Sequence, residues 1–203
     1  MRYTPEHKDK TRQRLLDAGG AIAKKDGFGT TGVDSLMASV GLTSGAFYAH
    51  FRSKGALLEA IVDNELGRSI EVFGQQSHER MLQTLDNYLS LAHVEHPELG
   101  CALPCLSPEI ARAGEHTRQV FEQRLLQLLE AMRPHTGDDS KTWSIVSQVV
   151  GAVMLARAMD NKDCRQALLQ AVKQQIMLLL PATGPAASVR SDSSRASPPA
   201  HKE

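Results

Sequence analysis

Two cysteines and two histidines lie close together in the sequence, and they are the side chains best suited to thiol or metal chemistry. They are Cys101, Cys105, His93 and His96. On a helix, a spacing of four residues would place both thiols on one face, although Pro104 lies between them. Three interpretations are open: small buried hydrophobic residues, a switch that responds to oxidants or electrophiles, or a metal site that includes the histidines. Burial is the usual state of free cysteines, so we expect no metal site.

The histidines of the chain form no catalytic motif. No nucleophile or metal-hydrolase pattern surrounds any of the eight histidines, and no glycine-rich phosphate loop follows a strand. We therefore expect that the protein is not an enzyme and that it uses no cofactor.

The segment from Thr30 to Lys54 has the composition that a helix-turn-helix motif needs to place its second helix in the major groove of DNA. Gly41 can take the positive φ that ends one helix, and Leu42 can pack into the core. Thr43 can begin the next helix by capping it through its hydroxyl. Similar turns also occur in proteins that bind no nucleic acid.

The helix after this turn begins with small residues and continues with aromatic ones. The small residues at positions 44–46 would let the backbone approach a groove closely, and free amides at a helix amino terminus favour phosphate oxygens. Phe47 and Phe51 are four residues apart and therefore share a face, which we expect to be buried. Tyr48 and His50 are displaced toward the other side of the helix.

Helical periodicity runs through most of the chain without strand alternation, which predicts an all-α protein of about nine helices. The segment 100–114 is ambiguous, because a helix could start at Ser107 with Pro108 in its first turn, or start near Cys101 and kink at Pro108. Pro97 and Pro134 are expected to end the helices before them. The other helices are predicted at about residues 7–26, 33–40, 44–50, 53–73, 81–92, 120–132, 143–159 and 163–180.

The composition indicates a soluble globular protein, with 41% hydrophobic and 23% charged residues among 203. The longest apolar run, Val149–Ala156, is far shorter than the roughly 20 residues of a membrane-spanning helix. The amino terminus has no secretory signal and the cysteine count is odd, so the cytoplasm is the expected compartment. The net charge is zero, but residues 1–60 carry nine Lys or Arg against six Asp or Glu, which suits a polyanionic partner.

Two segments, GFGTTGV (Gly27–Val33) and VGLTSGAFYAHFRSK (Val40–Lys54), resemble the DNA-binding domain of the TetR family of bacterial transcriptional regulators. The resemblance covers about residues 8–60 in sequence, and the rest agrees in helix number, order and length. It implies a helix-turn-helix domain over 1–55 and a larger helical effector-binding and dimerisation domain over 56–180. The remaining segment, 181–203, is rich in Pro, Ala and Ser, and we expect it to be disordered.

The resemblance also implies a homodimer that reads a palindromic double-stranded DNA operator with the third helix of each subunit. Contacts with DNA phosphates give affinity without specifying sequence. The small residues at the start of the third helix imply that few side chains read the base edges directly. Lys8, Lys10 and Arg12 would add further contacts with the DNA phosphate backbone. Thr31, Thr43, Tyr48, His50 and Lys54 would contact phosphates, and Ser44, Gly45 and Ala46 would lie closest to the base edges.

The resemblance further implies a ligand pocket among the helices of the larger domain. The inward-facing residues expected there carry few charges, which suits an apolar or aromatic effector, although each of them also fits an ordinary core. They are Phe73, Met81, Leu85, Tyr88, Cys105, Phe121, Leu125, Trp143, Val146, Val150 and Met154.

The last two helices have the residues of a dimer interface. Gly151, Ala152, Ala156 and Ala158 on one helix, with an apolar stripe on the other, suit a four-helix contact between two copies. Cys164, at the start of the last helix, is expected to be structural and near this interface.

These features predict a repressor that a small apolar, aromatic or thiol-reactive effector releases from DNA, while activation stays open. The alternative is a helical thiol- or metal-binding protein that uses Cys101 and Cys105 and has no role on DNA.

Overall fold

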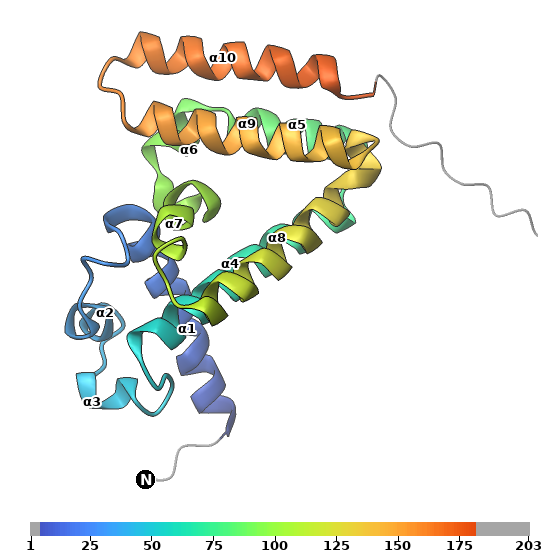
Figure 1. The fold of residues 1–203 in the computed structure, drawn as a ribbon. Helices are drawn as coiled ribbons and strands as arrows, with labels where there is room; N and C mark the ends of the chain where they lie inside the picture. Colours follow the sequence, from blue (N-terminus) through green and yellow to red (C-terminus); the bar gives the residue numbers. More distant parts are fainter. Residues whose placement is uncertain (1–4, 182–203) are drawn as a thin grey trace, which may run out of the picture.

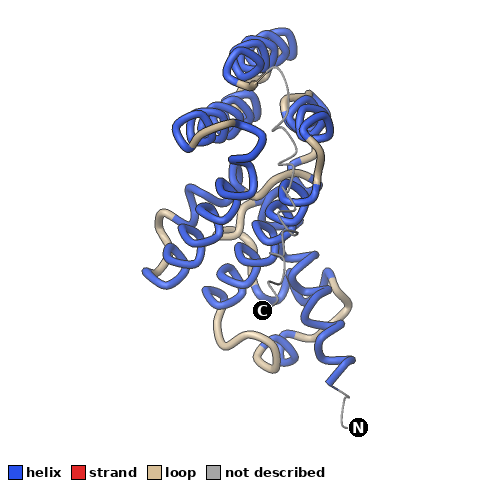
Figure 2. The backbone as a smooth tube through the Cα atoms, turned by 90° about the vertical axis from the view of Figure 1, so that its right-hand side faces the viewer, coloured by secondary structure: helices blue, strands red, loops and turns tan. Residues whose placement is uncertain are grey.

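The computed structural model describes residues 5–181, and within this range the chain folds into helices without a strand (Figure 1). This confirms the all-α prediction, and short loops join the helices (Figure 2). Apart from residue 181, the segment expected to be disordered lies outside the described residues. The elements are α1 (Pro5–Asp26), α2 (Val33–Ser39), α3 (Ser44–Phe47), α4 (Lys54–Gln75), α5 (His78–Tyr88), α6 (Leu91–Glu95), the 3₁₀-helix η1 (Pro97–Leu99), α7 (Leu103–Ile110), α8 (Glu115–Thr136), α9 (Asp139–Arg157) and α10 (Lys162–Leu179).

The turn between α2 and α3 has the predicted geometry. Gly41 has φ +71°, a conformation that a residue with a Cβ adopts only with strain, and Leu42 packs against the core. The helix that follows is shorter than expected, because α3 ends at Phe47 and continues only as a turn to His50.

The amino terminus of α3 is not capped as predicted, whereas that of α4 is capped by a side chain. The Thr43 hydroxyl makes no capping hydrogen bond to α3. The Thr43 carbonyl instead accepts a hydrogen bond from the Ala46 amide at 2.9 Å. At the start of α4 the Ser53 hydroxyl accepts from the Ala56 amide at 3.1 Å, as expected for a capping serine.

Two long helices, α4 and α8, pack along each other and form the middle of the molecule (Figure 1). The helix-turn-helix lies at one end of this pair, where α1 packs against α4. At the other end α10 packs on α9, so these two helices form the face farthest from α3. Between the two ends, α7 contacts both α1 and α9.

The structure also fixes the boundaries of the helices in two further segments, 81–92 and 100–114. The single helix expected over 81–92 is divided into α5 and α6, because Ser90 starts a new helix by accepting a hydrogen bond from the His93 amide at 3.2 Å. In the ambiguous segment, α7 starts at Leu103, close to Cys101, and contains Pro108 in its interior.

The prediction that Pro134 ends its helix is wrong. Pro134 lies in the last turn of α8, which continues to Thr136 and closes with a hydrogen bond from the Gly137 amide to the Arg133 carbonyl at 3.0 Å. Pro134 contributes no amide donor to this last turn. The next helix also begins earlier than predicted, because the Asp138 carboxylate caps it.

One continuous apolar core joins all parts of the fold, from Leu15 and Phe47 near the amino end to Leu169 and Ile176 in α10. Within the described residues, no helix combines the length and apolarity that crossing a membrane requires.

Candidate functional site

The exposed face of α3 carries small side chains, and the turn that follows carries one exposed aromatic ring. Gly45 is exposed and has open space where a Cβ would lie, and the Tyr48 side chain is 69% exposed. This face is held rigidly from below, because Phe47 and Phe51 are buried as predicted and their ring centroids lie 5.8 Å apart. The Tyr48 ring meets the Phe47 ring edge-on at 5.3 Å.

Basic side chains from α1 lie beside this face. The Arg12 guanidinium stacks over the Phe51 ring, 4.7 Å from its centroid. Partial burial lowers the pKa of His50, and the positive charges of Lys8 and Arg12 lower it further. The positive field at His50 therefore comes from side chains on a separate helix, which the fold brings to the carboxyl end of α3.

The loop before α2 is fixed to the start of α4. The Lys54 ammonium donates to the Gly29 carbonyl at 3.0 Å and lies 4.9 Å from the Phe28 ring centroid, and the Thr31 hydroxyl donates to the Gly27 carbonyl at 2.9 Å. Both side chains thus have partners within the chain. Ser44 is half-buried, and its hydroxyl donates to the Asp34 carboxylate, an acidic neighbour that the sequence did not indicate.

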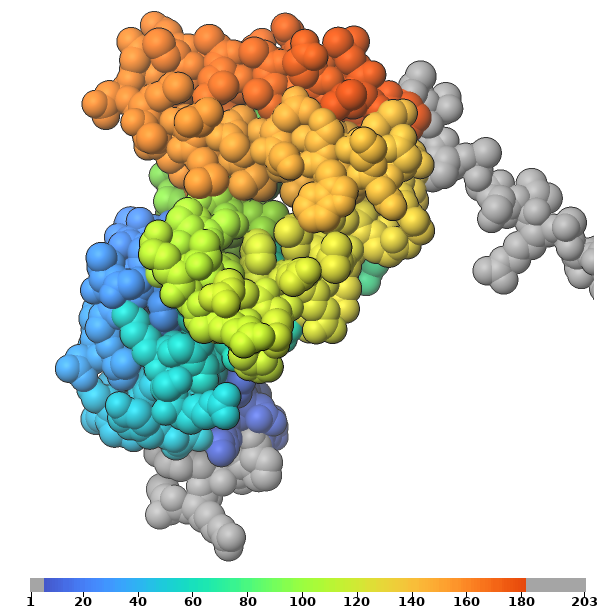
Figure 3. All heavy atoms as spheres, viewed as in Figure 1, coloured from blue at the N-terminus to red at the C-terminus, as the bar shows by residue number. Residues whose placement is uncertain are grey.

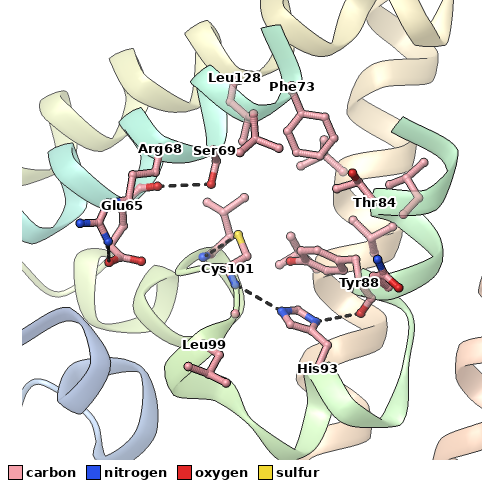
Figure 4. A pocket seen from close by; sticks show the side chains of 18 of the residues that line it. Glu65, Arg68, Ser69, Phe73, Thr84, Tyr88, His93, Leu99, Cys101 and Leu128 are labelled. Carbon is pink, nitrogen blue, oxygen red and sulfur yellow. Dashed lines mark hydrogen bonds and ion pairs between the residues drawn. The ribbon is translucent and has the colours of Figure 1, made fainter. Parts of the chain in front are cut away.

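A cavity of about 550 Å³, open on one side, lies in the larger helical part, between α4, α5, the segment around η1, α8 and α9 (Figure 4). Five of the residues predicted to line a pocket are in its wall: Phe73, Leu85, Tyr88, Val146 and Val150. The wall also contains Lys24, Glu65, Arg68, Ser69, Val72, Thr84, Asn87, His93, Glu98, Leu99, Gly100, Cys101, Leu103, Leu128, Met132 and Val149.

The other residues predicted to line the pocket lie elsewhere. Trp143 and Met154 are on the outer side of α9, 45% and 38% exposed, and Met81 is fully buried core. Phe121 and Leu125 lie on α8 and pack against the core. Cys105 faces α9 instead of the cavity, since the Arg157 guanidinium donates to its sulfur at 2.8 Å.

A buried ion pair closes one end of the cavity. The Lys24 ammonium, on α1, contacts the Glu65 carboxylate of α4 at 2.8 Å, with their side chains only 6% and 9% exposed. The same ammonium donates to the Gly100 carbonyl at 2.9 Å. Beside this pair, Arg68 binds Asp17 and lies 3.8 Å from Glu65. This network joins segments far apart in the chain, and no local pattern in the sequence indicates it.

His93 connects two segments of the cavity wall. Its Nε2 accepts a hydrogen bond from the Cys101 amide at 3.2 Å, so Nδ1 carries the proton and donates to the Tyr88 carbonyl at 2.8 Å. Burial lowers the pKa of His93, which keeps the ring neutral as this arrangement requires. A Cβ on Gly100 would lie 2.5 Å from Cδ2 of the ring and closer still to Nε2, so only glycine fits there.

The two neighbouring thiols are separated by the structure. Cys101 precedes α7 and lines the cavity, whereas Cys105 lies within the helix and contacts Arg157, so they do not share a helix face. Burial raises the pKa of both thiols and disfavours the reactive thiolate. Among residues 5–181, no three His, Cys, Asp or Glu side chains are grouped closely enough to hold a metal ion.

Helix α7 also contacts the helix-turn-helix. The Glu109 carboxylate accepts a hydrogen bond from the Phe28 amide at 2.6 Å, in the loop to which Lys54 is fixed. The cavity wall, the α9 helix and the loop before α2 are therefore linked through one short helix.

Comparisons with known proteins agree with this arrangement. The family model described as bacterial regulatory proteins of the tetR family matches residues 15–61. The chain is similar to YfiR, an uncharacterised HTH-type transcriptional regulator of Bacillus subtilis, with 25% identity over 89 residues, 43% of each chain. It is also similar to the HTH-type transcriptional regulator UidR of Escherichia coli, with 33% identity over 63 residues, 31% of this chain and 32% of UidR. The matches thus span less than half of these curated relatives.

Solved structures are matched over most of their length. The reduced form of Escherichia coli NemR has a TM-score of 0.66 at 20% identity, with 85% of this chain and 98% of that chain covered. A TetR-family regulator from Cytophaga hutchinsonii also has a TM-score of 0.66, at 19% identity, with 88% and 98% covered. The relatives are regulators, in agreement with the expectation that the chain is no enzyme. Residues 15–61 thus match the bacterial regulatory proteins of the tetR family, and the fold over most of the chain is similar to that of solved TetR-family regulators.

Proposed function

We propose that the protein is a homodimeric, ligand-responsive repressor that occupies a palindromic operator in the cytoplasm and leaves it when an apolar effector fills the cavity. The observation that carries this proposal is the exposed face of α3, which presents small residues beside the basic side chains of α1. We assign residues 1–55 to DNA binding and 56–180 to effector binding and dimerisation.

The proposed DNA contacts follow from exposure and charge. Thr43, Gly45 and Tyr48 are exposed, so a phosphate backbone can reach them without rearrangement of the core. Ala46 and Ser44 are half-buried at the start of the helix and would lie over base edges. Because these side chains are small, shape and backbone contacts would supply most of the affinity.

Replacing Lys54 by methionine is expected to lower operator affinity and to reduce the slope of log K against log salt concentration by about 0.9, since one phosphate contact is lost. Tyr48→Phe is expected to weaken binding without changing the slope, because it removes a neutral hydroxyl. Fluorescence anisotropy on a duplex selected from a random library measures both quantities.

The matched control for charge is Lys173→Met, on α10, where an exposed lysine pairs with Asp86 far from α3. This variant should keep the salt slope of the wild type. If the wild type selects no duplex from the library, the regulator proposal fails and the thiol-protein alternative replaces it.

The proposed dimer interface is the outer face of α9 and α10, at the end of the molecule opposite α3 (Figure 3). Large apolar side chains are exposed there, including Leu155 at 57% and Leu178 at 79%. Burial of such a patch between two copies would remove it from water. Ala152 and Ala156, which the sequence suggested for this interface, are already buried within the chain.

The double variant Leu155→Glu/Leu178→Glu is expected to convert the dimer to a monomer at micromolar concentration, because it would bury unpaired carboxylates in the interface. Sedimentation velocity measures the change. Leu126→Glu, on α8, replaces a leucine that is 51% exposed outside this face and should leave the dimer intact. A wild type that sediments as a monomer would remove the interface proposal.

The cavity is the proposed effector site because its volume falls within the range of small-molecule pockets, about 300–1,000 Å³. Its wall includes Lys24 of α1 and the start of α7, which reaches the helix-turn-helix through Glu109. A ligand that favours one arrangement of these contacts would shift the equilibrium between different placements of α3 relative to the larger helical domain. Reversible binding is favoured over thiol modification, since burial raises the pKa of both Cys101 and Cys105.

A further inference from the structure

One shielded donor in the cavity wall has no oxygen or nitrogen acceptor. The Tyr88 hydroxyl is screened from solvent, and its neighbour is the weakly accepting Cys101 thiol. Figure 4 shows the Tyr88 ring pointing its hydroxyl into the space between Cys101 and Phe73. A shielded donor without a good acceptor is costly, and each such group in a folded protein calls for an explanation.

The neighbouring polar groups of the wall are already satisfied by the protein. Lys24 and Glu65 bind each other, and the Thr84 hydroxyl is 2.9 Å from the Gln76 side-chain oxygen. The Ser69 hydroxyl donates to a backbone carbonyl, and both ring nitrogens of His93 have partners. Among these groups, the Tyr88 hydroxyl is therefore the donor that has no oxygen or nitrogen acceptor within the protein and can give its hydrogen bond to a bound molecule.

The charges around the cavity are paired, which decides the kind of ligand. Each cation has an anionic partner, Lys24 with Glu65 and Arg68 with Asp17. A carboxylate ligand would lose its hydration in the cavity, and no unpaired cation is there to compensate for that cost. An uncharged carbonyl oxygen needs only one hydrogen-bond donor. Exposed apolar side chains stand at the rim, Leu99 at 82% and Val72 at 52%, so the approach also favours an apolar molecule.

We propose that the Tyr88 hydroxyl recognises the effector by donating a hydrogen bond to an uncharged carbonyl oxygen, so that the ligands are apolar ketones, esters or quinones. This inference rests on the proposed role of the cavity as the effector site. Burial raises the pKa of Tyr88 well above its ordinary value, so the hydroxyl keeps its proton. His93 acts as a positioning residue, since its ring lies 4.4 Å from the Tyr88 ring and holds the Tyr88 backbone carbonyl.

The test uses Prodan, an apolar naphthalene ketone whose emission moves to longer wavelength when its carbonyl accepts a hydrogen bond. Wild type and Tyr88→Phe are titrated with Prodan, and the matched control is Tyr48→Phe, the same change at an exposed tyrosine in the turn after α3. We expect Tyr88→Phe to shift the bound emission to shorter wavelength and to weaken binding about three- to tenfold, the usual range for one neutral hydrogen bond. Without ligand, its melting temperature should change little, because the lost hydroxyl has only the weakly accepting Cys101 thiol beside it.

Competition separates the charge argument from simple hydrophobic binding. The ketone 2-dodecanone should displace Prodan, and the dodecanoate anion, of similar length, should not. Equal displacement by both, or identical emission and affinity in wild type and Tyr88→Phe, would overturn the proposal, as would absence of Prodan binding to the wild type. Operator binding is measured on the same samples. If operator binding persists while the Prodan result is negative, only the ligand inference has failed. If the wild type does not bind operator DNA, the proposed function has failed.

Discussion

Replacement of Lys24 by methionine is expected to lower the free energy of unfolding by about 3 kcal/mol, near the lower end of the range for breaking a buried ion pair. The change leaves the Glu65 carboxylate, 9% exposed, without its partner at 2.8 Å. It also leaves the Gly100 carbonyl without the ammonium donor. Arg68, 3.8 Å from the same carboxylate, would compensate in part, which is why we expect the lower end.

Urea unfolding followed by circular dichroism measures this loss. Lys10→Met is the matched control, because Lys10 pairs with Glu6 at the same 2.8 Å but both side chains are more than 70% exposed. An exposed pair of this kind contributes little. The double variant Lys24→Met/Glu65→Leu should recover most of the loss, since two apolar groups replace the pair. Equal stability of Lys24→Met and Lys10→Met would contradict the prediction.

Gly100→Ala is expected to lower the free energy of unfolding by about 2–3 kcal/mol, because the new methyl group would overlap the His93 ring. Gly100 has φ −91°, so the backbone itself tolerates alanine and the cost comes from the ring alone. To make room, His93 would give up its hydrogen bonds with the Cys101 amide and the Tyr88 carbonyl. The loss should therefore also weaken Prodan binding in the cavity.

A double-mutant cycle with His93→Ala checks this cause. If the ring is the obstacle, Gly100→Ala should cost little in the His93→Ala background, and the two changes should be strongly non-additive. Gly67→Ala is the control, because Gly67 lies within α4 and has open space where a Cβ would be placed. That variant should be neutral or stabilising, since alanine favours helix. Additive costs at Gly100 and His93 would disprove the steric explanation.

The helix-turn-helix was predictable because its signals are local. A glycine that needs positive φ and two phenylalanines four residues apart each act within one or two turns of chain, and Gly41, Phe47 and Phe51 behave as expected. Thr43 has the right residue type for a cap, but its hydroxyl makes no such bond. Residue type alone does not fix a rotamer.

The cavity was only partly predictable, because apolar periodicity indicates which residues face inward but not which face an empty space. Phe73 and Tyr88 line the cavity, while Phe121 has the same periodicity and packs in the core. Trp143 is expected on an inward helix face that lines the pocket, yet it is on the outer side of α9. The Lys24–Glu65 pair depends on three segments that meet only in the folded chain, so no pattern within one segment indicates it.

Helix α7 has consequences for how measurements on the protein relate to one another. Within eight residues it contributes Leu103 to the cavity wall, Cys105 to the contact with Arg157 of α9, and Glu109 to the amide of Phe28. If ligand and DNA act on opposite ends of this helix, the coupling is reciprocal by thermodynamic necessity. Saturating operator DNA must then lower effector affinity by the same factor by which effector lowers operator affinity. Ligand affinities measured on the free protein would therefore overstate the sensitivity of the operator-bound population.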